Sequence, residues 1–104
     1  MATAASKVNI ENEQVRVTTW SFRSEERTGL HTHEFPYVVV PLTPGRLRLE
    51  TSSGVETSEL AEGVCYFRDR GTQHDVVNDG SDSLVFVEVE LKACADPQAA
   101  FSGS

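Results

Sequence analysis

Regularly spaced glycines constrain the fold of this chain more than any other feature of its sequence. Five of them form two series with a nine-residue interval: Gly45, Gly54 and Gly63, then Gly71 and Gly80. Short runs of strand-forming residues lie between them, and residues 8–91 contain no sustained 3.6-residue period of helical length. Turn residues at such regular intervals are typical of antiparallel sandwiches and barrels. The sequence therefore predicts an all-β domain.

Runs of strand-forming residues predict seven strands in this domain, and those at 14–23 and 46–51 alternate clearly between apolar and polar residues. The seven strands cover residues 14–23, 37–40, 46–51, 55–60, 64–68, 74–78 and 84–91. A chain of 104 residues is long enough for one domain and too short for two. We therefore expect a single barrel over residues 8–92, with flexible tails of small and polar residues at 1–7 and 93–104.

The composition limits the partners of this domain. The net charge of −7, from 16 acidic and 9 basic residues, disfavours binding to nucleic acid. No apolar run approaches the roughly 20 residues of a membrane helix, and the first residues, MATAASK, lack the apolar segment of a signal peptide. We therefore expect no membrane partner and a cytoplasmic location. Cys65 and Cys94 form neither a disulfide framework nor a zinc ribbon, and Cys65 is expected to be a small buried residue of its strand.

Two histidines one residue apart, His31 and His33 in GLHTHEFPYVVVPL, suggest a metal site. Residues i and i+2 of a strand point to the same face roughly 7 Å apart, which lets two imidazoles converge on one ion. We expect the strand at residues 37–40 to continue from this pair. A third ligand is needed, and the one remaining histidine is His74, in GVCYFRDRGTQHDVVN. The sequence thus predicts that these three histidines bind a metal; the alternative for the pair is a surface position on an alternating strand.

The two histidine stretches resemble the paired motifs of the cupin family, whose members fold as a double-stranded β-helix, or jelly-roll barrel. The second stretch fits the second motif from Gly63 to Asn78, except that Asp69 stands where the family usually has proline. In the first stretch, Gly45 falls at the closing glycine of the first motif. The opening glycine of that motif would fall at Glu25, and its glutamate ligand would fall at Val38. The chain therefore resembles the three-histidine cupins.

The same run of residues is similar to small cupins described as β-alanine degradation proteins. Other three-histidine cupins are iron(II) dioxygenases that cleave β-diketones or oxidise thiols. Three neutral imidazoles leave the full +2 charge on a divalent ion, so the site favours a small anionic substrate. This resemblance implies Fe²⁺ and a non-haem dioxygenase. Two alternatives stay open: a hydrolase, isomerase or lyase with Zn²⁺, Ni²⁺ or Mn²⁺ in the same ligands, and a non-catalytic cupin that binds a small molecule.

Three further polar residues are candidates for the site. Alternation directs Tyr37 into the barrel, either to hydrogen-bond a substrate oxygen or simply to line the interior. Arg68 either neutralises a substrate carboxylate or forms an ion pair at the surface. Glu88 either orients a ligand histidine or is solvated, like Glu90. The resemblance to cupins, together with apolar strand faces, also implies a homodimer that pairs through an outer sheet.

Overall fold

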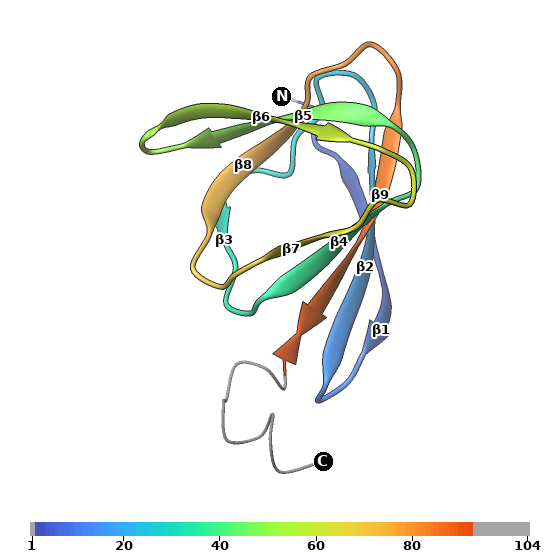
Figure 1. Cartoon of the computed structure of the whole chain (residues 1–104), viewed down its shortest axis with the longest axis vertical. Helices are drawn as coiled ribbons and strands as arrows, with labels where there is room; N and C mark the ends of the chain where they lie inside the picture. The colour runs from blue at the N-terminus through green and yellow to red at the C-terminus, as the bar shows by residue number, and fades with distance from the viewer. Residues whose placement is uncertain (1, 93–104) are drawn as a thin grey trace.

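The computed structural model describes residues 2–92, which form two antiparallel sheets packed face to face (Figure 1). The five-stranded sheet has the order β1-β2-β9-β4-β7, and the four-stranded sheet has the order β3-β8-β5-β6. The strands are β1 (Ala5–Glu11), β2 (Val15–Phe22), β3 (His31–Thr32), β4 (Tyr37–Pro41), β5 (Gly45–Thr51), β6 (Gly54–Leu60), β7 (Tyr66–Arg68), β8 (Gln73–Asn78) and β9 (Leu84–Leu91). Within residues 2–92, no helix has the length and apolar character needed to cross a bilayer.

The seven predicted strands are all present, with ends shifted by a few residues. Two further strands, β1 and β3, were not predicted as separate elements. Residues 5–7, predicted to belong to a flexible tail, form the first part of β1. This prediction was wrong because every residue of β1 is exposed, so the strand carries no alternation of burial and is held by backbone pairing to β2. The tail predicted at residues 93–104 lies outside the described residues.

The histidine pair and the strand that follows it belong to different sheets. His31 lies in β3 of the four-stranded sheet, whereas Tyr37 begins β4 of the five-stranded sheet. The chain bends at Glu34 and Phe35, directly before Pro36. The expectation that the strand continues from the histidines into β4 was therefore wrong. Pro36 fixes its own φ and restricts the residue before it, which favours such a change of direction.

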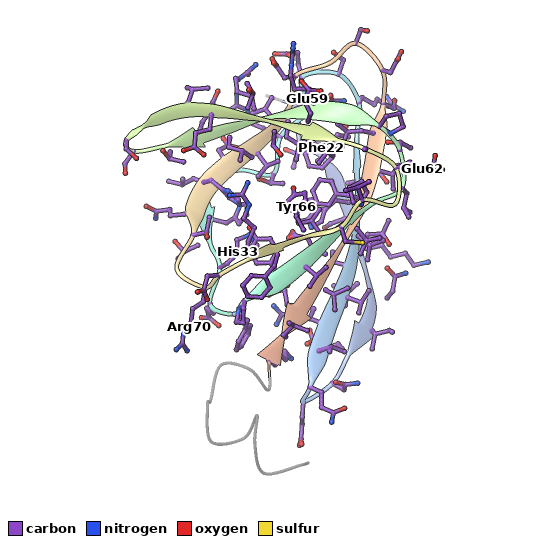
Figure 2. The ribbon with its side chains drawn as sticks, in the orientation of Figure 1. Phe22, His33, Glu59, Glu62, Tyr66 and Arg70 are labelled. Carbon is purple, nitrogen blue, oxygen red and sulfur yellow. The ribbon has the colours of Figure 1, made fainter. Side chains whose placement is uncertain are left out.

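One end of the space between the sheets is closed by apolar side chains. Phe22, Leu84 and Phe86 are each exposed by 3% or less, and the rings of Phe22 and Phe86 stack with centroids 5.4 Å apart. Each such side chain stabilises the fold by roughly 1.5–3 kcal/mol on burial. Gly45 packs so closely here that a Cβ on it would lie 2.9 Å from Leu84 Cδ2. Figure 2 shows Phe22 and Tyr66 between the sheets and His33 nearer the opposite end.

The outer faces of the two sheets differ in chemistry. On the outer face of β2, β9, β4 and β7, the side chains that alternate with the buried ones are half-buried or exposed and mostly apolar. The apolar ones are Val15, Val17, Val38, Val40, Phe67, Val85, Val87, Val89 and Leu91, and the polar ones are Thr19 and Ser21 of β2. The outer face of the four-stranded sheet instead carries ion pairs, including Arg48 with Asp79 at 2.7 Å and Arg27 with Asp75 at 2.7 Å. The charged face is suited to water, whereas the apolar face is not.

Candidate metal centre

Three imidazoles meet at the open end of the barrel because β3 and β8 are paired. His31 lies directly opposite His74 in this antiparallel pair. The pairing extends past the end of β3, since His33 N–H donates to the Thr72 carbonyl at 2.9 Å and Gly71 N–H donates to the His33 carbonyl at 2.8 Å. The backbone therefore keeps its extended alternation through His33. As a result, all three rings project to the same side, as the sequence predicted.

The ring nitrogens of this cluster are close enough to share one ion. One nitrogen from each of the three histidines lies within 4.8 Å of the others, and the Nε2 atoms of His31 and His33 are 3.0 Å apart. His31 Nδ1 is 2.8 Å from the carbonyl oxygen of Gly29. If Nδ1 carries the proton and donates it to this carbonyl, Nε2 keeps its lone pair for a metal, an arrangement common among ligating histidines. The donor set thus fits a divalent transition metal.

Burial keeps two of the imidazoles neutral, which is the form that binds metal. His33 is 8% exposed and His74 is 5% exposed. Burial, followed by the neighbouring His31 and His74, lowers the pKa of His33 to about 3. Burial, followed by His31 and Arg68, lowers the pKa of His74 to about 4. The two rings are therefore ready to bind a cation at neutral pH without first losing a proton.

Asp75, which the sequence analysis did not single out, supports His31 from behind. Its carboxylate accepts a hydrogen bond from Gly29 N–H at 3.1 Å and pairs with Arg27 at 2.7 Å. Because the carbonyl of the same Gly29 contacts His31 Nδ1, Asp75 helps to fix the orientation of that ring. Asp75 alternates with His74 on β8 and points outward, so no pattern in the sequence links it to the site.

Tyr37 occupies the inward position on β4 that lies nearest to the histidines. It is 2% exposed, and its ring stacks on His33 with centroids 3.9 Å apart and planes 23° from parallel. Burial raises the pKa of the Tyr37 hydroxyl. Val38, where the resemblance placed the missing glutamate ligand, belongs instead to the outward side of β4. The inward position beside the histidines therefore holds a phenol and not a carboxylate.

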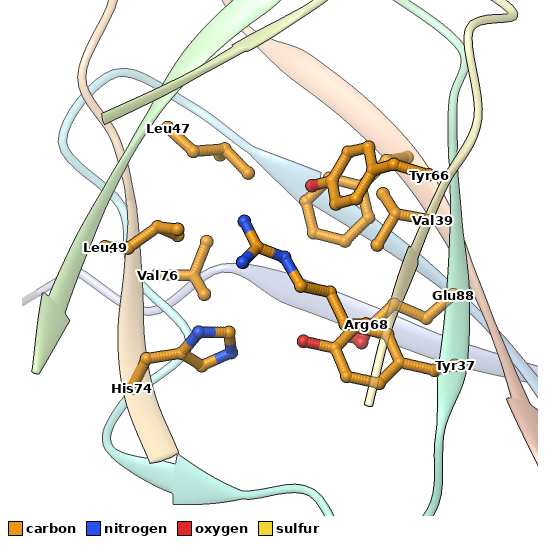
Figure 3. A pocket seen from close by; sticks show the side chains of 10 residues that line it. Tyr37, Val39, Leu47, Leu49, Tyr66, Arg68, His74, Val76 and Glu88 are labelled. Carbon is orange, nitrogen blue, oxygen red and sulfur yellow. The ribbon is translucent and has the colours of Figure 1, made fainter. Parts of the chain in front are cut away.

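Arg68 lies inside the barrel, with its guanidinium directed into a pocket (Figure 3). Its guanidinium carbon is 5.4 Å from the centre of the Tyr66 ring, and no carboxylate of residues 2–92 lies within ion-pair distance of it. The free volume of this pocket is about 20 Å³, which is room for roughly one water molecule. The pocket is lined by Tyr37, Val39, Leu47, Leu49, Tyr66, Arg68, His74, Val76, Phe86 and Glu88. The surface ion pair considered for Arg68 does not form among the described residues.

Glu88 is buried, so the expectation that it is solvated was wrong. It is 7% exposed and lies on the inward face of β9. Burial, followed by repulsion from Glu90, raises the pKa of Glu88 to about 7, while a hydrogen bond from the Trp20 indole lowers it. Within residues 2–92, no hydrogen bond or ion pair joins Glu88 to a histidine, so the predicted role of Glu88 in orienting a ligand histidine has no support from its contacts. Glu90 is also shielded from solvent and pairs with Arg16 at 3.3 Å.

A wider groove reaches the histidines from the other side. Its volume is about 410 Å³, and its walls come from β1, β2, β9 and the segment around β3. His31 and His33 line this groove, whereas His74 lines the interior pocket, and Glu88 lines both. The three-histidine cluster therefore lies where the two spaces adjoin. Cys65 takes no part in either space: it is exposed just before β7, contrary to the expectation that it is buried.

Two antiparallel sheets with three histidines at one open end define a small cupin, and comparisons with known proteins agree. No family model matches the sequence. A crystal structure of a cupin domain from Bordetella pertussis has a TM-score of 0.85 and 47% identity, and the match covers 88% of this chain and 95% of that one. A double-stranded β-helix protein from Klebsiella pneumoniae has a TM-score of 0.72 at 19% identity over 90% of this chain and 81% of that one, which supports the fold alone.

The particular family follows from a sequence relative. The chain is 45% identical over 89 residues to the β-alanine degradation protein BauB of Pseudomonas aeruginosa. The aligned region covers 86% of this chain and 94% of that protein. The chain therefore belongs to the family of small cupins that includes BauB.

Proposed function

We propose that the protein is a metal-dependent enzyme, a non-haem iron(II) dioxygenase that acts on a small anionic metabolite at the three-histidine centre. The observation that carries this proposal is the convergence of the three imidazoles, with ring nitrogens within 4.8 Å of one another. When bound, iron(II) supplies reactivity toward O₂ next to the substrate. The similarity to BauB suggests a place in the breakdown of a small amino acid or a product of it. A cytoplasmic location is part of the same proposal.

The charge of the site supports an anionic substrate. Three neutral imidazoles leave the charge of a divalent ion uncompensated, and the buried inward position on β4 holds Tyr37 in place of a carboxylate. Arg68 adds a second positive charge inside the barrel, and its guanidinium has no carboxylate partner within residues 2–92. A substrate carboxylate satisfies this guanidinium through bidentate hydrogen bonds.

Tyr37 has a positioning role in this proposal. Its ring packs against His33, which restricts the rotation of that ligand. Its raised pKa keeps the hydroxyl protonated across the physiological range, so it donates a hydrogen bond to a substrate oxygen. A Tyr37→Phe variant keeps the stacked ring and removes the donor. We expect weaker substrate binding in that variant with unchanged metal content.

Metal analysis and O₂ uptake test the proposed activity together. We expect protein purified without added metal to contain one divalent ion per chain, and a His74→Ala variant to lose it, with affinity lowered by about a hundredfold or more. Gln73→Ala, at the exposed neighbouring position, is the matched control. The iron-loaded protein should then consume O₂ with one member of a panel of β-diketones, thiols and small amino acids. Substrate conversion under nitrogen would instead assign the site to a hydrolase, isomerase or lyase.

We also propose that the protein forms a homodimer through the outer face of the five-stranded sheet. Strand spacing and rise give the outer face of the five-stranded sheet an area of roughly 500 Å² per protomer. Two copies would bury roughly 1,000 Å² in total, at the lower limit for a biological interface. The acidic chain disfavours a polyanionic partner, whereas the apolar face is complementary to itself because neither copy brings a charge to its centre.

Substitution at the centre of that face tests the dimer. Val87 lies on β9 between β2 and β4, and Val55 is exposed on β6 of the other sheet. We expect Val87→Glu to convert a dimer to a monomer in sedimentation analysis, while the control Val55→Glu leaves the dimer intact. A wild-type chain that sediments as a monomer at high micromolar concentration would contradict this proposal.

A further inference from the structure

Arg68 and Glu88 are two charged side chains on the same inward face that the fold leaves without opposite partners. On this face, Arg68 pairs in register with Tyr37, and Glu88 pairs with Val39, the next inward residue of the same strand. Strand spacing and rise place their Cα atoms roughly 12 Å apart across β4. Both side chains line the interior pocket beside His74. A small molecule bound there would contact both ends of this pair.

The positive end of the pair is open to a ligand. Among residues 2–92, no ion pair joins Arg68 to a carboxylate, and its guanidinium carbon lies 5.4 Å from the centre of the Tyr66 ring. Figure 3 shows the guanidinium in the middle of the pocket, between His74 on one side and Tyr66 on the other. The side chain is half-buried and no protein anion compensates its charge, so the guanidinium is suited to bind an anionic ligand. Its five donors fit a carboxylate.

The negative end of the pair is open as well. Glu88 is the one acidic residue of the described chain that is buried, and no lysine, arginine or histidine there lies within ion-pair distance of it. The Trp20 indole supplies one hydrogen bond, which leaves the carboxylate with further acceptor sites. The nearby Glu90 is occupied by Arg16. A cationic group would therefore compensate Glu88 at a position where the protein itself supplies no cation.

Glu88 also faces both spaces around the metal centre. It lines the interior pocket and the groove of about 410 Å³ that His31 and His33 line. A ligand with one end at Arg68 and the other at Glu88 would thus lie beside the three-histidine cluster. The interior volume of about 20 Å³ limits the part of the ligand that enters the pocket to a few non-hydrogen atoms.

We propose that the site selects a small amino acid, whose carboxylate binds Arg68 and whose ammonium group binds Glu88. This inference rests on the proposed function for the location of the substrate, and it narrows the anionic metabolite to one that carries both charges. Arg68 and Glu88 are then specificity-determining residues. A carboxylic acid without the amine satisfies Arg68 alone, and an amine without the carboxylate satisfies Glu88 alone.

Calorimetric titration of the zinc-loaded protein at pH 8 tests this inference without turnover. The probes are β-alanine, which carries both groups, propionate, which lacks the amine, and propylamine, which lacks the carboxylate. We expect β-alanine to bind the wild type about tenfold or more tightly than either of the other two. Glycine and γ-aminobutyrate, with shorter and longer spacings between the two charges, then identify the spacing that fits best.

Two variants separate the ends of the pair. Arg68→Met should weaken β-alanine and propionate by a similar factor, about tenfold or more. Glu88→Gln keeps the shape and the acceptor for Trp20, so we expect it to weaken β-alanine by about tenfold while propionate changes by less than about twofold. Glu56→Gln, at an exposed position of β6, is the matched control and should change neither.

Contradictory results distinguish this inference from the proposed function. If propionate binds the wild type as tightly as β-alanine, or Glu88→Gln weakens the binding of both equally, then Glu88 does not bind the ammonium group. The proposed carboxylate site at Arg68 is not affected by that result. If no carboxylate binds and Arg68→Met has no effect, the proposed function loses its substrate site as well. Circular dichroism of each variant establishes that a lost affinity does not come from a lost fold.

Discussion

The two ends of the barrel interior share strand β9 but differ in the kind of side chain that they hold. At the closed end, β2 and β9 contribute Phe22, Leu84 and Phe86, all of them buried. Two residues further along, β9 contributes the buried Glu88 instead, and β7 contributes Arg68, whose register partner on β4 is Tyr37. The closed end is filled by apolar side chains, which need no partner from outside the chain. The open end leaves two charges and a set of imidazoles for something outside the chain to satisfy.

This difference indicates where the stability of the fold resides. Apolar burial at the closed end contributes favourable free energy, whereas each unpaired polar group at the open end costs some of it. The expected effect of a substitution on stability and on binding therefore depends on whether the residue lies at the closed or the open end. Changes at the closed end should weaken the fold and spare the chemistry. Changes at the open end should weaken metal or ligand binding and leave the fold intact, and some should stabilise the protein.

The largest effect should come from truncation at the closed end. Phe22 is 1% exposed and contacts the rings of Trp20 and Phe86. We expect Phe22→Ala to lower the free energy of unfolding by about 3–5 kcal/mol, because it removes buried surface and leaves a cavity. Chemical denaturation measures this loss. The metal content of the folded fraction should not change, and a variant that loses metal in proportion to stability would contradict the separation of the two ends.

Glu88 should show the opposite behaviour. Burial raises its pKa from the usual 4.5 to about 7. Between these values the folded protein holds a proton that the unfolded chain releases, so stability falls as the pH rises from about 4.5 to 7. The pKa difference corresponds to about 3 kcal/mol of stability present below pH 4.5 and absent above pH 7.

The matched comparison is with Glu88→Gln, which cannot titrate. We expect the variant to be more stable than the wild type at pH 8 and similar to it at pH 5, with the difference growing across the interval. Histidine contributions are common to both proteins and cancel in this difference. Parallel stability curves for the two proteins between pH 5 and pH 8 would show that Glu88 is not buried as described.

Arg68 offers a smaller test of the same contrast. Its guanidinium is half-buried and receives no carboxylate within residues 2–92. We expect Arg68→Met to keep or raise the free energy of unfolding, by up to about 1 kcal/mol, because an apolar side chain replaces an uncompensated charge. Anion binding should be lost in the same variant. A clear loss of stability would indicate that Arg68 has a structural partner, and its role at the open end would need revision.

The contrast between the ends also explains which features the sequence revealed. Alternation found the strands because one side chain in two points into a closed interior, and it placed Glu88 on the same face as Leu84 and Phe86. Charge then suggested that Glu88 is solvated, which was wrong because the inward face continues to the open end. Alternation shows which side chains lie on the same face of a strand. It does not show whether that face is exposed to solvent.

The histidine cluster was predictable and its surroundings were not. The spacing of His31 and His33 and the position of His74 predicted a shared site, and the structure brings the three rings together. Whether Arg68 faces inward depended on the pairing of β7 with β4, a contact between segments about 30 residues apart that no local pattern specifies. β1 gave no signal at all because its residues are exposed on both faces.

The smallest effect concerns the segment that joins the two sheets, where a strained residue takes the place of a glycine. Glu25 stands where the cupin motif would open with glycine, and it adopts a φ of +66°, a conformation that glycine favours. The strain costs about 1–2 kcal/mol, and glycine loses about 0.5–1 kcal/mol through its greater freedom in the unfolded chain. We therefore expect Glu25→Gly to raise the free energy of unfolding by about 0.5–1 kcal/mol.

The exposed contact of Glu25 with Arg48, at 3.7 Å, contributes little to this balance. Glu25→Ala keeps the Cβ and removes the same contact, so it should bring no gain, and equal stabilisation by both variants would show that the ion pair rather than the backbone is responsible. Unlike Glu88→Gln, the glycine variant should gain stability without any loss of ligand binding, because the strain at Glu25 serves no group at the open end.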